Sequence, residues 1–135
     1  YGKGDNIRDW LYVNDHCDAI YEALLKGKIG ETYNIGGNNE ISNLDIVHTI
    51  CSIMDEIRPR ENKRKYSELI KYVEDRPGHD FRYAIDTSKM KRELKWQPKE
   101  DFESGIKKTI NWYLNNPEWI EDLYLKYNQT RLGLK

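Results

Sequence analysis

The order of short apolar runs and longer amphipathic segments is the feature that most restricts how this 135-residue chain can fold. Runs at 7–13, 31–37, 69–75 and 83–86 have the length and the β-branched or aromatic content of short strands. Segments with helical spacing of apolar residues separate them. The alternation predicts an α/β fold, specifically a small mixed subdomain of short strands and about four helices. The strands are too few and too short for a complete doubly wound sheet, so we expect the chain to be part of a larger α/β protein.

Two helices are predicted in the first half of the chain. One begins at Asn14 or Asp15 and ends near Gly27, where the helical spacing stops. The other begins after Ser42, which together with Asp45 forms a capping-box pattern. The residues spaced to form the inward faces of these two helices are Cys17, Ile20, Ala23, Leu24, Leu44, Val47, Cys51 and Met54.

Two further helices are predicted in the second half. One starts at Asp86 or Thr87, and the other is capped by Asp101 or its neighbour and ends at Pro117. Residues 121–135 are weakly amphipathic, and we expect them to form a carboxyl-terminal tail after a domain that spans residues 1–120. The inward faces of these two helices are expected to hold Met90, Leu94, Phe102, Ile106, Ile110 and Tyr113.

The charge balance argues against a nucleic-acid partner. There are 22 basic and 23 acidic residues, giving a net charge of −1, whereas a nucleic-acid binder usually has a basic excess or stripe. The densest basic run, residues 58–65, is interpreted as a solvated loop. Charged residues make up 33% of the chain against about 25% in typical domains, so we expect the thin apolar core to pack against a further segment or subunit.

Cysteine usage and hydropathy indicate a cytoplasmic protein. Cys17 and Cys51 lie in helical patterns and form no CxxC pair, which predicts reduced, buried, structural thiols. The three histidines share no ligand spacing with them, so no metal site is predicted. No apolar run approaches 18 residues and no signal peptide is present, so we expect neither a membrane-spanning segment nor secretion.

The sequence contains no self-contained catalytic or cofactor motif. GKGDNI begins like the dinucleotide fingerprint GxGxxG, but Ile7 stands where the third glycine belongs. There is no GxxxxGK[ST] phosphate loop, no GxSxG elbow and no HExxH pair, and no tyrosine is followed four positions later by lysine. We therefore predict no catalytic and no cofactor-binding residue within this chain. Because the chain opens at Tyr1 without methionine, we expect it to be cut from something longer.

Two isolated residues have the chemistry to bind an anion. Arg8, at the start of a predicted strand, can hold a phosphate through two hydrogen bonds or can pair with Asp9. Asn43 lies in the first turn of a predicted helix, whose amides favour anions, and is alternatively an ordinary helix-start asparagine.

The stretch VEDRPGHDFRY, residues 73–83, is the most specific candidate. Pro77 and Gly78 predict a shaped turn, and the residue before a proline is biased toward extended geometry. Arg76 and His79 on either side of that turn can both donate to phosphate oxygens. The alternative interpretation is a polar loop closed by a pair between Asp75 and Arg76.

Five motifs occur in order from Tyr1 to about Trp119: YGKGDNIRDWLYVNDH, GETYNIGGNNE, NLDIV, DRPGHDFRYAID and FESGIKKTINWYL. Together they resemble the carboxyl-terminal half of dTDP-glucose 4,6-dehydratases, which are NAD-dependent members of the extended short-chain dehydrogenase/reductase superfamily. IRDWLYV and DRPGHD are quite specific to this family. GETYNIG also occurs in related sugar-nucleotide epimerases and dehydratases.

The resemblance implies that catalysis and substrate binding are carried out by different parts of the whole protein. A Rossmann domain outside this chain would bind NAD and carry the catalytic residues, while this chain would bind the dTDP end of a dTDP-sugar. The parent reaction converts dTDP-glucose to dTDP-4-keto-6-deoxyglucose and water. The family is commonly dimeric, and its product serves deoxysugar pathways such as that of rhamnose. The implied substrate contacts are Tyr1 beside the base, Arg8 on the diphosphate, Asn43 on the nucleotide, and Asp75, Arg76, Pro77, Gly78 and His79 along the diphosphate and ribose.

Two other functions stay open at the level of sequence. The chain could belong to a sugar-nucleotide epimerase or a different nucleotide-sugar dehydratase of the same superfamily. It could also be a non-catalytic module that binds a nucleotide or a protein partner.

Overall fold

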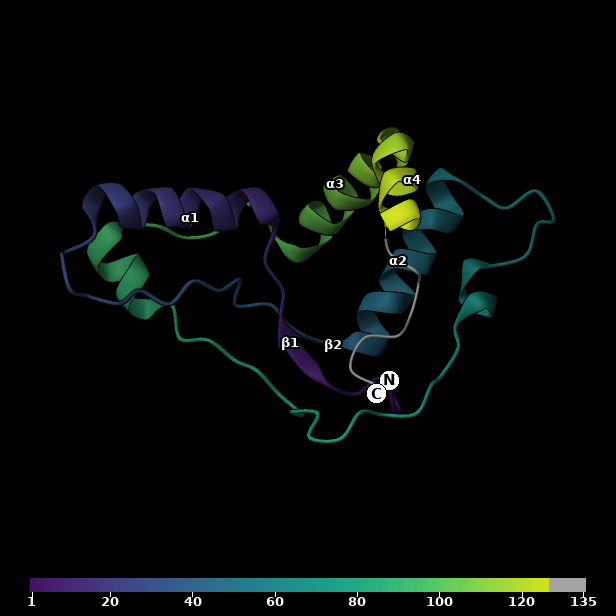
Figure 1. Ribbon diagram of the computed structural model, residues 1–135, viewed down its shortest axis with the longest axis horizontal. Helices are drawn as coiled ribbons and strands as arrows, with labels where there is room; N and C mark the ends of the chain where they lie inside the picture. Colours follow the sequence, from purple (N-terminus) through teal and green to yellow (C-terminus); the bar gives the residue numbers. More distant parts are fainter. Residues whose placement is uncertain (127–135) are drawn as a thin grey trace.

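A two-stranded antiparallel sheet lies at the centre of the computed structural model, which describes residues 1–126 (Figure 1). Strand β1, Ile7–Asp9, pairs with strand β2, Glu40–Ser42. Arg8 stands opposite Ile41 in this register. The predicted strand at 7–13 is therefore real but shorter, because helix α1 already begins at residue 13.

The other edge of β1 is also paired. The Ile7 amide donates to the Phe81 carbonyl at 2.8 Å, and the Tyr83 amide donates to the Ile7 carbonyl at 3.1 Å. Ile7 and Arg82 form an isolated parallel bridge at the same place. Strand β1 thus lies between two segments that come from far along the chain.

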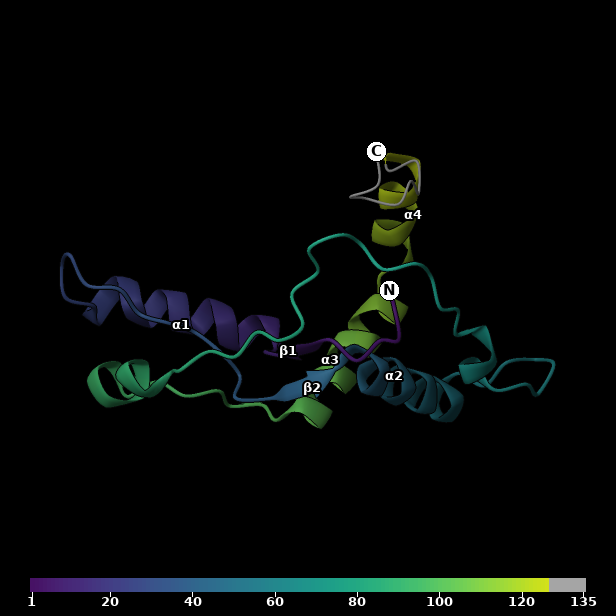
Figure 2. The same cartoon turned by 90° about the horizontal axis from the view of Figure 1, so that it is seen from below.

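Helices lie on both sides of this sheet. In Figures 1 and 2, α1 and a short helix η2 lie on one side, and α2, α3 and α4 lie on the other. A long segment, residues 70–87, crosses from one side to the other past the amino terminus. The helices are α1 Val13–Lys26, α2 Asn43–Ile57, the 3₁₀ turn η1 Tyr66–Leu69, the π-helical turn η2 Met90–Leu94, α3 Phe102–Asn115 and α4 Pro117–Lys126.

Two predicted helix caps are confirmed. The Ser42 hydroxyl oxygen accepts from the Asp45 amide at 3.1 Å and donates its own hydrogen to the Asp45 carboxylate at 2.6 Å. The Asp101 carboxylate accepts from the Ser104 amide at 2.8 Å. Pro117 follows α3 as expected, but it also occupies the first position of α4, where its missing N–H costs nothing. Residues 127–135 of the predicted tail lie outside the described residues.

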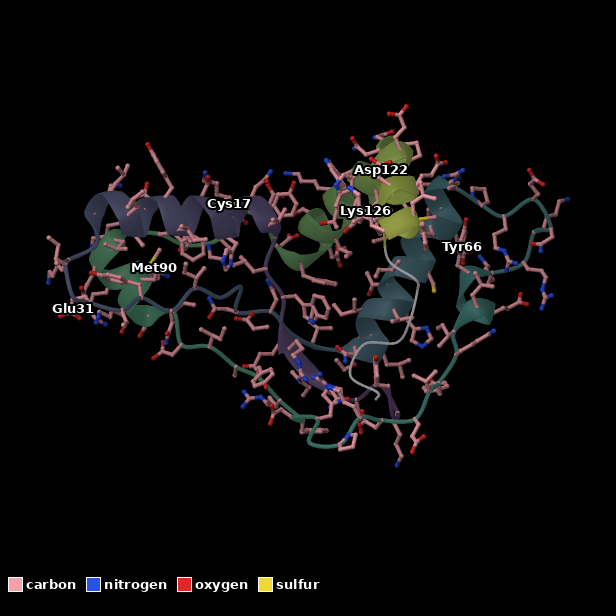
Figure 3. The ribbon with its side chains drawn as sticks, viewed as in Figure 1. Cys17, Glu31, Tyr66, Met90, Asp122 and Lys126 are labelled. Carbon is pink, nitrogen blue, oxygen red and sulfur yellow. The ribbon has the colours of Figure 1, made fainter. Side chains whose placement is uncertain are left out.

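The core beside α1 is small, and of the four α1 residues predicted to face it only Ala23 packs against it. Met90, labelled in Figure 3, is fully buried between η2 and α1. Ile20 and Leu24 remain 51% and 78% exposed. Cys17, predicted to be buried, is exposed as well. The buried cluster is Ala19, Met90, Leu94 and Trp96, with Leu11, Ala23, Tyr33 and Ile35 packed against it.

The face of α1 that is buried carries Asp15, Ala19 and Ala23, at intervals of four residues. The two alanines let η2 approach closely, while Asp15 supplies hydrogen bonds to the chain after Trp96. A face of small residues and one carboxylate is not recognisable from hydrophobic spacing, which explains why the prediction was wrong.

Helices α2 and α3 pack on each other on the other side of the sheet. Ile46 and Ile53 are the buried apolar residues of α2, whereas Val47, predicted inward, is 38% exposed. On α3, Ile110 is buried as predicted and Tyr113 is 44% exposed. None of the helices within residues 1–126 is both long and apolar enough to cross a membrane.

Three predicted strands are absent from the described chain, because residues 31–37, 69–75 and 83–86 are not assigned as strands. The helix predicted from Asp86 or Thr87 is present but short, running from residue 88 to the end of the π-helical turn η2. A strand requires a hydrogen-bonding neighbour. Residues 31–37 have the strand composition but find no such neighbour among residues 1–126.

Asp15 offers a direct test of how α1 is held. It is only 3% exposed, and one carboxylate oxygen accepts from the amides of Lys99 and Glu100 at 3.1 and 2.9 Å. Asp15→Ala leaves both donors without this acceptor, so we expect the free energy of unfolding to fall by about 2–3 kcal/mol. The matched control is Asp18→Ala, which removes an exposed ion pair to the Lys99 ammonium and should cost less than about 1 kcal/mol. Urea denaturation measures both; equal losses would contradict the assignment.

Candidate functional site

The turn at residues 75–79 is closed by the Asp75 carboxylate. One oxygen of Asp75 accepts from the Arg76 amide at 2.9 Å and from Nδ1 of His79 at 2.7 Å. An ionised carboxylate can only accept, so Nδ1 of His79 carries the hydrogen of this bond. Gly78 has φ +68, which confirms that the turn needs a residue able to adopt the left-handed region. Asp75 therefore pairs with the backbone of Arg76, and no hydrogen bond to the Arg76 guanidinium is described within residues 1–126.

The amino terminus lies against this turn. The Gly2 amide donates to the Val73 carbonyl at 2.9 Å. The ring of Tyr1 meets the ring of His79 edge to face, with centroids 6.2 Å apart. A Cβ at Gly2 would stand 2.9 Å from the Asp75 carboxylate, so the glycine permits this close approach. The His79 side chain is only 8% exposed.

Arg8 is held by backbone carbonyls and an aromatic ring, not by Asp9. Its guanidinium donates to the carbonyls of Ile7 at 2.7 Å and Asp80 at 2.9 Å, and it lies 4.5 Å above the centre of the Tyr83 ring. Asp9 is engaged elsewhere, because its carboxylate accepts from the backbone amides of the turn after residue 36. The alternative of an Arg8–Asp9 ion pair is therefore wrong.

Asn43 reaches the same region through Asn6. The buried Asn6 accepts the Asn43 amide through its backbone carbonyl at 3.0 Å and donates from its side chain to the Asp80 carbonyl at 3.2 Å. The next two amides of α2 are also bonded, to Gly4 and to the Ser42 hydroxyl. The free helix amides invoked for an anion are therefore already used, and Asn43 retains only its side chain for a ligand.

The charges of two arginines, Arg8 and Arg76, act on one tyrosine. The pKa of Tyr83 is raised, first by its hydrogen bond to the Asp80 carboxylate and then by the charge of that group. The positive charges of Arg8 and Arg76 oppose the rise, so both guanidinium groups act on the same phenol. The sequence positions predicted to bind an anion thus gather around β1 and the 75–83 segment.

Three residues of this region were not predicted. Asp80 and Tyr83 lie inside the quoted stretch 73–83, three positions apart, and nothing in their spacing indicated that they contact each other. Asn6 carries no sequence signal of its own, since a lone asparagine in a glycine-rich loop normally indicates a turn. Only the three-dimensional pairing of β1 with residues 81–83 reveals their role.

Within residues 1–126, the GKGDN loop does not have the geometry of a dinucleotide-binding turn, and no metal-binding cluster is found. The GKGDN loop leads into strand β1 instead of a helix, and its carbonyls cap the first turn of α2. Within residues 1–126, no three His, Cys, Asp or Glu side chains are grouped so as to hold a metal ion. A groove of about 620 Å³ lies elsewhere, between the β1–α1 connection and α3, and contains none of the predicted site residues.

Comparison with known proteins supports the family resemblance. The family model described as GDP-mannose 4,6 dehydratase matches residues 1–109. dTDP-glucose 4,6-dehydratases from Escherichia coli and Neisseria meningitidis are 61% identical over 123 residues and 49% identical over 136 residues. These alignments cover 91% and 98% of this chain, but only 34% and 38% of the relatives.

Solved structures agree. The dTDP-glucose 4,6-dehydratase from Bacillus anthracis, in complex with NAD, matches 88% of this chain with a TM-score of 0.75 and 48% identity. The enzyme of that name from Streptomyces venezuelae, with NAD and TYD bound, matches 88% with a TM-score of 0.78 and 34% identity. The chain covers 35% and 34% of these two structures.

The match over residues 1–109 shows that the chain belongs to the GDP-mannose 4,6 dehydratase family. Within that family, the curated relatives quoted above are dTDP-glucose 4,6-dehydratases. The chain spans about a third of their length.

The hydrogen bond that closes the turn can be tested by titration. The His79 bond lowers the pKa of Asp75 below the ordinary 3.8, so ionised Asp75 stabilises the turn. This contribution is complete above about pH 3.8 and is lost as the pH falls through the lowered pKa. We expect His79→Ala to raise the Asp75 pKa toward 3.8, as followed by carboxyl NMR. The pKa of Asp86, lowered by Ser88, serves as the control and should not move. An unchanged Asp75 pKa would disprove the pairing.

Proposed function

We propose that this chain is the substrate-binding part of a dTDP-glucose 4,6-dehydratase. Residues 1–120 would hold the dTDP portion of dTDP-glucose, which the whole enzyme would convert to dTDP-4-keto-6-deoxyglucose and water. The observation that carries the proposal is the convergence of Arg8, Arg76 and His79 around the 75–83 segment, within motifs that match the family.

The chemistry of these groups suits a diphosphate. Two guanidiniums and an imidazole supply directed donors for oxyanions, and Arg76 is exposed with no side-chain hydrogen bond described in residues 1–126. Tyr1 is 44% exposed and lies on the edge of His79, where an aromatic ring can stack on a base. Asn43 adds an amide, while Asp75 and the Pro77–Gly78 turn hold the cluster in shape.

The proposed role of the chain is to hold and orient the substrate. Fixing a substrate in a reactive position can account for several kcal/mol of a barrier, so loss of a gripping residue should impair turnover as well as affinity. NAD would supply the oxidation and reduction steps from the remaining two-thirds of the enzyme, because the residues of this chain do not fit it. No catalytic residue is assigned to the chain.

Helix α1 offers a surface for that remaining part. Besides Ile20 and Leu24, its exposed face includes Tyr21 at 59% and Leu25 at 59%. So many exposed apolar side chains on one helix are typical of an interface. We infer that a Rossmann domain packs on this face of α1. A strand of that domain would pair with residues 31–37 and so supply the hydrogen-bonding neighbour that they lack.

The family resemblance further leads us to propose a cytoplasmic homodimer that serves deoxysugar synthesis, for example of rhamnose.

An activity assay of the full-length protein tests this function. We expect NAD-dependent formation of the 4-keto-6-deoxy product from dTDP-glucose, and no turnover by the 135-residue chain alone. UDP- and GDP-sugars serve as competing substrates. Preference for a UDP- or GDP-sugar would favour another dehydratase or an epimerase. This comparison is informative because the chain is also similar to the UDP-glucose 4-epimerase of Thermotoga maritima, with 26% identity and a TM-score of 0.71. Binding without any turnover by the full-length protein would favour a non-catalytic module.

Arg76 provides the sharpest test of the site. In the full-length protein, Arg76→Ala should weaken dTDP binding by about 1.5–3 kcal/mol, the scale of a charge-assisted hydrogen bond. The control is Arg64→Ala, an arginine paired with Glu68 in the basic run at 58–65, which should leave the dissociation constant unchanged. Calorimetry measures both. An unchanged constant for Arg76→Ala would remove this residue from the site.

A further inference from the structure

Tyr83 and Asp80 form a unit beneath the Arg8 guanidinium. The Tyr83 hydroxyl donates to the Asp80 carboxylate, and the face of its ring lies under Arg8. The backbone carbonyl of Asp80 accepts from Nη2 of Arg8. Asp80 therefore contacts Arg8 directly through its backbone and indirectly through the tyrosine, and the three residues make a closed ring of interactions.

These contacts fix the guanidinium and leave Nε without a described partner. Nη1 of Arg8 donates to the Ile7 carbonyl, with a longer bond of 3.4 Å to Phe81, and Nη2 donates to Asp80. Within residues 1–126, no hydrogen-bond partner of Nε is described, and one is described for Nη2. Nε and Nη2 belong to the same edge of the group, which is the fork that binds two oxygens of an oxyanion.

The phenol is suited to this task. The Tyr83 hydroxyl donates to the Asp80 carboxylate, and this hydrogen bond raises the pKa of Tyr83. The bond restrains rotation of the ring, which is half exposed. A restrained ring face attracts a cation and removes water from one side of it, so the guanidinium plane is held before any ligand arrives.

We propose that Tyr83, held by Asp80, is a positioning residue that orients the Arg8 guanidinium toward the diphosphate of the substrate. The inference rests on the proposed function, since it takes the diphosphate as the ligand of Arg8. Tyr83 acts through Arg8, and its contribution is the orientation of that group.

A double-mutant cycle in the full-length protein tests the proposal, with dTDP as the probe and calorimetry as the measurement. Tyr83→Leu removes the ring face and should raise the dissociation constant by about 3- to 25-fold, the range expected of a cation–π contact. Tyr83→Phe keeps the ring but loses the hydrogen bond to Asp80, so it should raise the constant less than Tyr83→Leu does, by at most about 3-fold. In an Arg8→Ala background, Tyr83→Leu should change the constant by less than about 2-fold, because the group that it positions is gone.

Two further measurements separate positioning from a general structural effect. Phenylalanines of increasing fluorination at position 83 keep the ring but weaken its attraction for a cation, so the dissociation constant should rise stepwise. Tyr124→Leu, at a tyrosine on α4 that is 60% exposed, is the matched control and should have no effect. Thermal unfolding verifies that each variant folds. If Tyr83→Leu does not fold, the dissociation constants of the fluorinated series test the positioning role of Tyr83.

The outcomes are distinguishable. Failure of the unaltered full-length protein to bind dTDP would overturn the proposed function and this inference with it. If dTDP binds, an unchanged constant in Tyr83→Leu, a flat fluorinated series, or an equal effect of Tyr83→Leu with and without Arg8 would overturn the positioning role alone. An Arg8→Ala variant that binds dTDP normally would do the same.

Discussion

Pairing of strand β1 on both of its edges is the interaction on which the rest of the structure depends. On one edge, β2 brings the start of α2, and hence Asn43, beside the amino-terminal loop. On the other, the backbone of Ile7 fixes residues 81–83, and with them the turn at 75–79. A strand of only three residues thus assembles side chains from three parts of the chain. The apolar core could not do this alone, since it consists of a few residues beside α1 and between α2 and α3.

The proposed division, with substrate binding in this chain and catalysis in the rest of the enzyme, has a physical basis in this arrangement. Of the proposed anion-binding groups, the Arg8 guanidinium is anchored to backbone carbonyls and the His79 ring to a turn closed by Asp75, so the positions of these two do not depend on a large core. Preorganised donors of this kind lose little freedom when an oxyanion binds. The exposed face of α1, by contrast, contributes nothing to the site. It is available for contacts with the remainder of the enzyme.

The sequence predicted the parts of the fold that local chemistry determines. The caps at Ser42 and Asp101, the left-handed Gly78 and the α/β character follow from residues close together in the chain, and all are confirmed. The predicted inward face of α1 was wrong for Cys17, Ile20 and Leu24, because hydrophobic spacing marks the surface that a whole protein buries, whereas Ala23 packs as predicted. The strand predicted at 31–37 was wrong for the same reason, since it lacks a neighbour here. Asn6, Asp80 and Tyr83 could not be predicted, because their contacts with β1 and its loop join residues more than 70 positions apart, and the spacing of Asp80 and Tyr83 does not reveal the hydrogen bond between them.

The long separation between Arg8 and Asp80 has a consequence for how the site forms. Their hydrogen bond joins residues 72 positions apart, and the bond from Asn6 to the same carbonyl spans 74. Closing a loop of that length costs about 4 kcal/mol of chain entropy in the simplest scaling, before any contact is gained. Contacts of such range form late in folding, when local helices already exist. During synthesis, α1 and α2 can therefore appear before any anion-binding geometry, and the arginine at position 8 acquires its orientation only when the segment at 80–83 has emerged and docked.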